Sequence, residues 1–91
     1  PYAHPDFMRI GAMAFSPSGA TAYVTDAGNR RLHRLGVDAV TGALTRLGAV
    51  SLDGGGSHEI AVDPLGRFVY VSNFDSGTVS GFAVDAGTGS L

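Results

Sequence analysis

His58 and Glu59 are the residues of this chain best suited to acid–base chemistry, and they directly follow the glycine-rich stretch 53–57. An imidazole and a carboxylate can exchange protons with a substrate or position a water molecule against a carbonyl. Two plainer interpretations stay open, a solvated carboxylate at the start of a strand for Glu59 and an ordinary loop histidine for His58. Because adjacent strand residues point to opposite faces, the two side chains need not converge on one substrate.

Several other motifs resemble binding sites but are incomplete. The run His58–Val62 begins like a zinc-protease motif, but it ends in valine where the second histidine belongs. The run Gly54–Gly56 leads toward a predicted strand without a lysine, so it forms no phosphate-binding loop. Asp53 and Asp75 lack the spaced carboxylates of a calcium loop. We therefore predict no cofactor and no metal site, and Glu59 and His58 are the predicted catalytic residues on their acid–base chemistry.

The charged residues argue against nucleic acid or an anionic membrane as a partner. The net charge is −2, the six cations are all arginine, and the densest group is Arg30, Arg31 and Arg34 around His33. For this group we predict a solvated outer strand face in preference to an anion site. No apolar run approaches the ~20 residues of a membrane span.

The compartment is weakly defined by the sequence. Cysteine is absent, which excludes disulfides but leaves the redox environment open. We favour a cytoplasmic protein, with secretion or a periplasmic location as alternatives, because a signal peptide could precede this segment.

The elements that carry the candidate residues occur twice. Shifted by 47 positions, Ala12–Leu44 aligns without a gap on Glu59–Leu91, and 11 of the 33 residue pairs are identical. A period in the forties, built from short strand-like runs, is typical of a β-propeller blade. Tyr23 and Tyr70 recur at one position of this repeat, which predicts packing between blades more than ligand stacking.

The predicted fold is all-β, with two adjacent four-stranded propeller blades, the second lacking its outer strand. Residues 1–11 are the tail of a preceding strand and a loop, 12–58 one blade, and 59–91 a partial blade. Turns rich in proline, glycine and aspartate separate the predicted strands, which are 12–15, 21–25, 31–37, 44–51, 59–62, 68–72 and 78–84.

Two blades cannot close a propeller, which typically needs four to eight. Leu91 aligns with Leu44, the first residue of a fourth strand. We therefore expect a fragment of a longer propeller, in preference to a protomer that closes with copies of itself. In either case the remaining blades or further copies must cover the open faces.

The repeat resembles a known family at its second strands. Tyr23-Val24-Thr25-Asp26 and Tyr70-Val71-Ser72-Asn73, with the neighbouring S-P-S-G and D-P-L-G turns, are similar to YVTN-type repeats. More narrowly, residues 12–91 resemble the seven-bladed propeller lactonases, which include bacterial 6-phosphogluconolactonases and fungal carboxymuconate cyclases. The family's G-P-R-H-like tetrad is replaced by Gly56-Ser57-His58-Glu59, and Phe74 stands where a substrate-binding arginine is expected.

The resemblance implies a parent protein that hydrolyses a sugar lactone of the 6-phosphogluconolactone type without a redox cofactor. In a propeller the first strand of each blade lies nearest the axis, so His58 and Glu59 are expected at the mouth of the central channel. Glu59 is the residue that matches the family's pattern, and His58 is the weaker candidate. The alternative is a non-catalytic repeat scaffold for protein or envelope interactions. The isolated chain is expected to be inactive, because other blades must complete any site.

Overall fold

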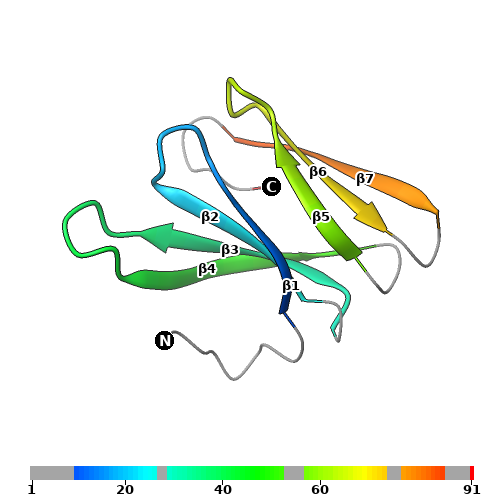
Figure 1. The fold of residues 1–91 in the computed structure, drawn as a ribbon, viewed down its shortest axis with the longest axis horizontal. Coiled ribbons are helices and arrows are strands. Elements are labelled where there is room, and N and C mark those ends of the chain that lie inside the picture. Colours follow the sequence, from blue (N-terminus) through cyan, green and yellow to red (C-terminus); the bar gives the residue numbers. More distant parts are fainter. Residues whose placement is uncertain (1–9, 27–28, 53–56, 74–76, 86–90) are drawn as a thin grey trace.

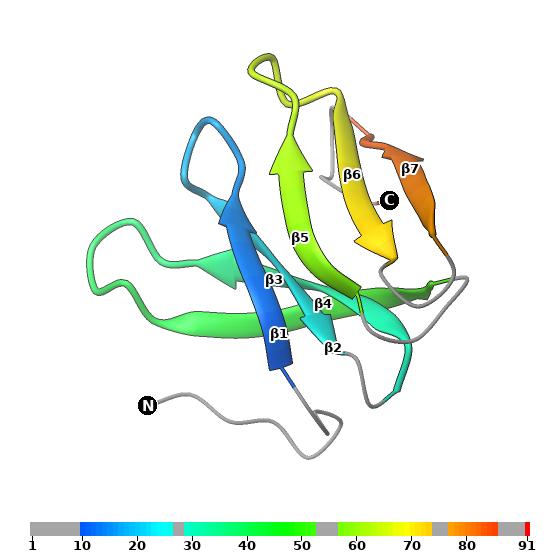
Figure 2. The same cartoon turned by 45° about the vertical axis from the view of Figure 1, so that its right-hand side comes forward.

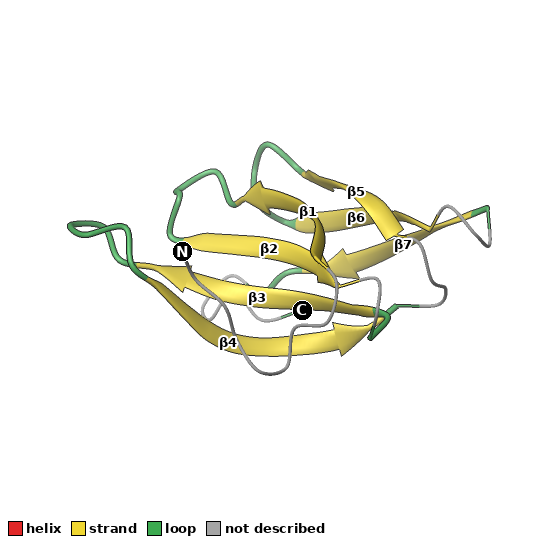
Figure 3. Cartoon of the chain, turned by 60° about the horizontal axis from the view of Figure 1, so that its bottom comes forward, coloured by secondary structure: helices red, strands yellow, loops and turns green. Residues whose placement is uncertain are grey.

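The computed structural model describes residues 10–26, 29–52, 57–73, 77–85 and 91. This described part contains strands and turns without a helix (Figures 1 and 3). No helix that could cross a membrane occurs in it. The described residues form seven strands, namely β1 (Ile10–Phe15), β2 (Thr21–Asp26), β3 (Arg31–Val37), β4 (Leu44–Ser51), β5 (Ser57–Val62), β6 (Phe68–Asn73) and β7 (Thr78–Ala83).

The strands form two antiparallel sheets, each a simple meander. Blade one has the order β1-β2-β3-β4, and blade two has the order β5-β6-β7. The predicted fold class, two adjacent blades with the outer strand of the second missing, is confirmed. Gly19 and Gly66 close the first hairpin of each blade at φ values of 76° and 72°. The N–H of Gly19 donates to the carbonyl of Ser16, and the N–H of Gly66 donates to the carbonyl of Asp63. This hydrogen bond closes a four-residue turn.

The two blades share one strand register. Ala14 pairs with Tyr23 in blade one, and Ala61 pairs with Tyr70, 47 residues later, in blade two. The pairs between the second and third strands match in the same way throughout. Even the irregularity at the start of the first strand recurs, between Ile10 and Met13 in β1 and between Ser57 and Glu59 in β5. The repeat in the sequence is therefore a repeat of backbone geometry.

An apolar seam joins the blades. Tyr23 and Leu32 of blade one are buried against Val69 and Val71 of blade two, together with Leu52. β1 and β5 lie beside each other (Figures 1 and 2), whereas β4 and β7 are the last strands of their sheets. This arrangement places the first strands at the inner edge of the pair. The predicted packing role is thus confirmed for Tyr23, while Tyr70 lies on the far face of blade two and is 44% exposed.

Two details differ from the sequence prediction. The first strand of each blade begins two residues early, at Ile10 and Ser57, because the chain already pairs with the second strand across the irregularity. The prediction of a solvated strand face is wrong for His33, whose side chain is 0% exposed. Its neighbours Arg30 and Arg31 are exposed as predicted.

Candidate functional site

Glu59 lies near the start of β5, the first strand of blade two. β5 runs beside β1, the first strand of blade one (Figure 2). It pairs with Ser72 of β6, directly after the irregular position of the strand, and its side chain is exposed. A bulge of this kind bends the strand and redirects a side chain, and such bulges are common beside functional sites. An exposed carboxylate therefore stands at the inner end of blade two.

A shallow cavity of about 180 Å³ adjoins Glu59. It is lined by Glu59, Ile60, Ala61, Tyr70, Ser72 and Val79. The pairs Glu59–Ser72 and Ala61–Tyr70 belong to the face of blade two turned away from blade one, whereas Ile60 packs toward the seam. The carboxylate and the hydroxyl groups of Tyr70 and Ser72 are its polar side-chain groups. The volume is below the ~300 Å³ of a typical ligand pocket. The face can therefore hold one side of a small ligand and needs a second wall opposite.

The backbone of His58 occupies the irregular position between Ser57 and Glu59 in β5. Its side chain lies outside the described residues. The regular alternation of a strand does not apply at a bulge, so the sequence argument that separates the two side chains loses its force here. A shared role for His58 and Glu59 remains a prediction. The predicted connector is described only from Ser57 onward.

Blade one carries nothing comparable at the matching place. Ala12 stands where blade two has Glu59, and its backbone N–H donates to Thr25 Oγ1 at 2.8 Å. This place in blade one adjoins blade two, since β1 and β2 both lie against β5. The carboxylate is therefore a feature of blade two alone among the described first strands.

Blade one instead carries a buried polar cluster that the sequence analysis missed. Asp26 and His33 are both fully buried, and Asp26 Oδ2 lies 3.4 Å from His33 Nε2. Arg46 Nε donates to His33 Nδ1 at 3.3 Å, and Asn29 Nδ2 donates to Asp26 Oδ2 at 2.9 Å. Burial lowers the pKa of His33, and Arg46 and Arg31 add to this effect, whereas Asp26 opposes it. His33 is therefore neutral at pH 7.

Blade two has a neutral version of this cluster at the matching positions. Asn73, the counterpart of Asp26, donates from Nδ2 to Oγ of Ser80, the counterpart of His33, at 2.7 Å. The same amide group lies 3.3 Å from Thr78 Oγ1. Both pairs tie the end of the second strand to the third strand. A signal was present in the alignment, because the positions of Asp26 and His33 are polar in the second repeat as well, where Asn73 and Ser80 stand.

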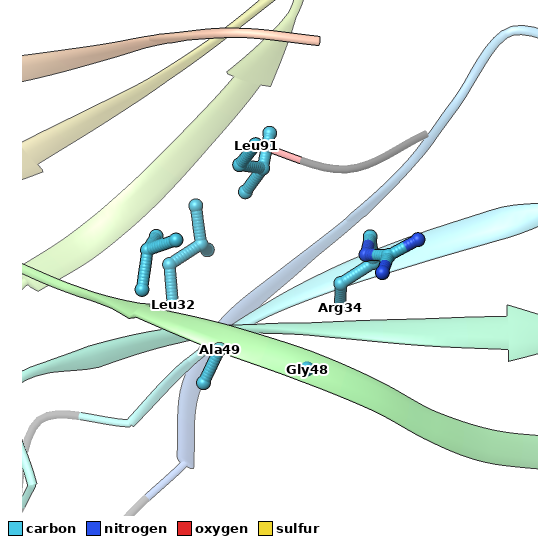
Figure 4. Close-up of a pocket in the computed structure, with 6 residues that line it drawn as sticks. Leu32, Arg34, Gly48, Ala49 and Leu91 are labelled. Atoms are coloured by element: carbon cyan, nitrogen blue, oxygen red, sulfur yellow. The ribbon is translucent and has the colours of Figure 1, made fainter. Parts of the chain in front are cut away.

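A second cavity lies at the seam, farther from the inner edge (Figure 4). It measures about 100 Å³ and is lined by Leu32, Arg34, Gly48, Ala49, Val50 and Leu91. Arg34 is the one charged residue among those that line the cavity. Burial raises the pKa of Tyr23, and the positive charge of Arg34 opposes this rise. The cavity is too small for a ligand of ordinary size. It is a packing gap between the blades.

Comparisons with solved structures give close matches in fold. The chain superimposes on the Pseudomonas aeruginosa periplasmic gluconolactonase PpgL with a TM-score of 0.85 and 30% identity, over 97% of this chain and 25% of that one. For a candidate 6-phosphogluconolactonase from Bacteroides fragilis the TM-score is 0.80 and the identity 26%, over 88% of this chain and 22% of that one. For another from Bacteroides uniformis the TM-score is 0.78 and the identity 28%, over 87% of this chain and 24% of that one.

These structures are much longer than the sequence described here. The chain spans about a quarter of the length of each, which agrees with the expected fragment of a longer propeller. No curated protein matches the chain. The family model for "Lactonase, 7-bladed beta-propeller" matches residues 3–91. With its paired blades, shared register and YVTN-type second strands, the chain belongs to the seven-bladed β-propeller lactonase family.

Proposed function

We propose that the protein containing this chain hydrolyses a sugar lactone of the 6-phosphogluconolactone type. The observation that carries the proposal is the exposed carboxylate of Glu59 at the inner end of a blade that belongs to a lactonase family. The relatives named as a gluconolactonase and as candidate 6-phosphogluconolactonases support the substrate class.

Glu59 would act as a general base on the attacking water. The carboxylate takes a proton from the water while the water oxygen bonds to the lactone carbonyl carbon. The ring C–O bond then breaks, and the ring oxygen receives a proton as it leaves as a hydroxyl. His58 is the proposed donor of that proton. The proton held by Glu59 then returns to His58, so the reaction consumes one water molecule and needs no redox cofactor.

The wall of blade two supplies only part of such a site. Ser72 lines the cavity beside Glu59 and offers its hydroxyl group to the substrate, whereas Tyr70, on the same face, is expected to pack against the next blade. The opposite wall would come from another blade of the parent protein. For this reason we expect no turnover by the 91-residue chain alone.

The test is the hydrolysis of 6-phosphogluconolactone and of gluconolactone by the longer protein that contains this sequence, followed as acid release. Glu59→Gln keeps the size of the side chain and removes the base, so kcat should fall about 100-fold or more. The matched control is Asp63→Asn, which removes one carboxylate just beyond the other end of β5 and should leave kcat unchanged.

Equal activity of the Glu59→Gln variant and the unmodified protein would remove Glu59 from the mechanism. If the longer protein hydrolyses neither lactone above background, the lactonase proposal is wrong and the non-catalytic scaffold is favoured. That alternative rests on the replaced tetrad at 56–59 and on Phe74, of which Phe74 lies outside the described residues.

A further inference from the structure

The hydrogen bond from Arg46 defines where the proton of His33 sits. The guanidinium of Arg46 can only donate, so the 3.3 Å contact from its Nε requires Nδ1 of His33 to accept. The single proton of the neutral ring is then on Nε2, which faces Asp26 Oδ2 at 3.4 Å. The imidazole thus links β2, which carries Asp26, to β4, which carries Arg46.

A second proton on His33 is incompatible with the hydrogen bond from Arg46 to its Nδ1. In the imidazolium both ring nitrogens donate, so Nδ1 and Arg46 Nε would face each other as two donors on two cations. The 3.4 Å contact with Asp26 would become an ion pair, whereas Arg46 would be repelled. Uptake of one proton therefore favours the contact to β2 at the expense of the contact to β4.

The strand that would be released is poorly secured at this point. The pairing of β3 with β4 is irregular between Arg34 and Leu35, where Leu47 has no partner between Arg46 and Gly48. β4 also forms the outer edge of its sheet and pairs on one side only. An irregular edge strand opens more easily than a central one.

We propose that the Asp26–His33–Arg46 cluster is an acid-sensitive latch, which holds β4 on blade one at neutral pH and releases it when His33 is protonated. Blade two lacks the device, because Asn73 and Ser80 make the corresponding tie without a titrating group. The inference is independent of lactone hydrolysis.

The direction of the pH effect follows from the surroundings of His33. Burial is the main cause of its lowered pKa, Arg46 and Arg31 act in the same direction, and Asp26 opposes them. An unfolded histidine titrates near its ordinary value of about 6.5. Below that pH the unfolded or opened state binds more protons than the latched state, so the latch weakens as the pH falls.

Two measurements on the protein test the latch. NMR titration of the histidine side chains should give His33 a pKa below its ordinary value, and Arg46→Met should raise that pKa because the opposing cation is gone. Amide hydrogen exchange, corrected for the intrinsic effect of pH, should speed up about tenfold or more in β4 between pH ~7.5 and ~5. Exchange in β6 and β7 should change much less and serves as the internal control.

The non-titrating variant His33→Gln distinguishes release of β4 through His33 from destabilisation of the whole fold by acid. Glutamine can accept from Arg46 and donate to Asp26 but takes up no proton in this range, so β4 exchange should lose its extra pH dependence. The proposal is overturned if β4 and β6–β7 respond alike to pH in the unmodified protein. It is also overturned if Arg46→Met leaves the pKa of His33 where it was, a result that does not depend on the folding of the glutamine variant.

Discussion

The two blades place matched residues in one register but in different surroundings, and their tyrosines show the contrast most clearly. Tyr23 is 1% exposed because blade two covers its face, whereas Tyr70 is 44% exposed on a face that no described residue covers. Backbone pairing is the same for both. Strand geometry is therefore set within a blade, and burial is set by the neighbouring blade.

The largest expected effect is a difference in stability between the two variants in which one tyrosine is replaced by alanine. Tyr23→Ala removes a ring from the centre of the seam and should lower the free energy of unfolding by about 3 to 5 kcal/mol. Tyr70→Ala removes a ring that is already partly in water and should cost about 1 kcal/mol or less in this chain. Urea unfolding of the two variants measures both values. Equal losses would mean that the matched positions do not differ in packing as described.

A smaller effect is expected when the polar pair of blade two is moved into blade one. His33→Ser alone takes the imidazole away from the buried carboxylate of Asp26 and should cost about 2 kcal/mol. Adding Asp26→Asn recreates the pair of Asn73 and Ser80 and should recover part of that loss. A double variant less stable than the sum of the single changes would contradict the equivalence of the two ties.

The smallest effect concerns one turn position. Arg30 adopts a φ of 55°, and its counterpart in blade two is Gly77 at 68°. Glycine reaches this left-handed region without strain, so Arg30→Gly should stabilise the chain by up to about 1 kcal/mol. The reverse change, Gly77→Arg, should destabilise it by a similar amount. Thermal unfolding of both variants checks the signs, and two changes of the same sign would argue against a shared turn.

The fold was largely predictable from the sequence because the repeat supplies a second copy against which each strand can be checked. Tyr23 and Pro17 mark a strand and a turn, and their counterparts 47 residues later confirm the spacing. The early start of β1 and β5 was missed, because the irregular pairing before Glu59 has no simple periodic pattern.

The candidate site was only partly predictable. Glu59 was found from its chemistry and family context, but the direction of its side chain depends on the bulge and on the face of blade two that remains open. The cluster around His33 was missed because a histidine among arginines looks solvated in a sequence. Its hydrogen-bond partner Arg46 comes from another strand, which the sequence alone does not place beside it.

The central claim is that the exposed face of blade two is an interface of the same kind as the seam around Tyr23. Hydroxyl-radical footprinting of the longer protein tests it most directly, with Tyr23 as the buried reference in the same molecule. We predict that Tyr70 is protected to the same degree as Tyr23 there, although it reacts readily in the 91-residue chain. A Tyr70 that reacts equally fast in both would contradict the claim.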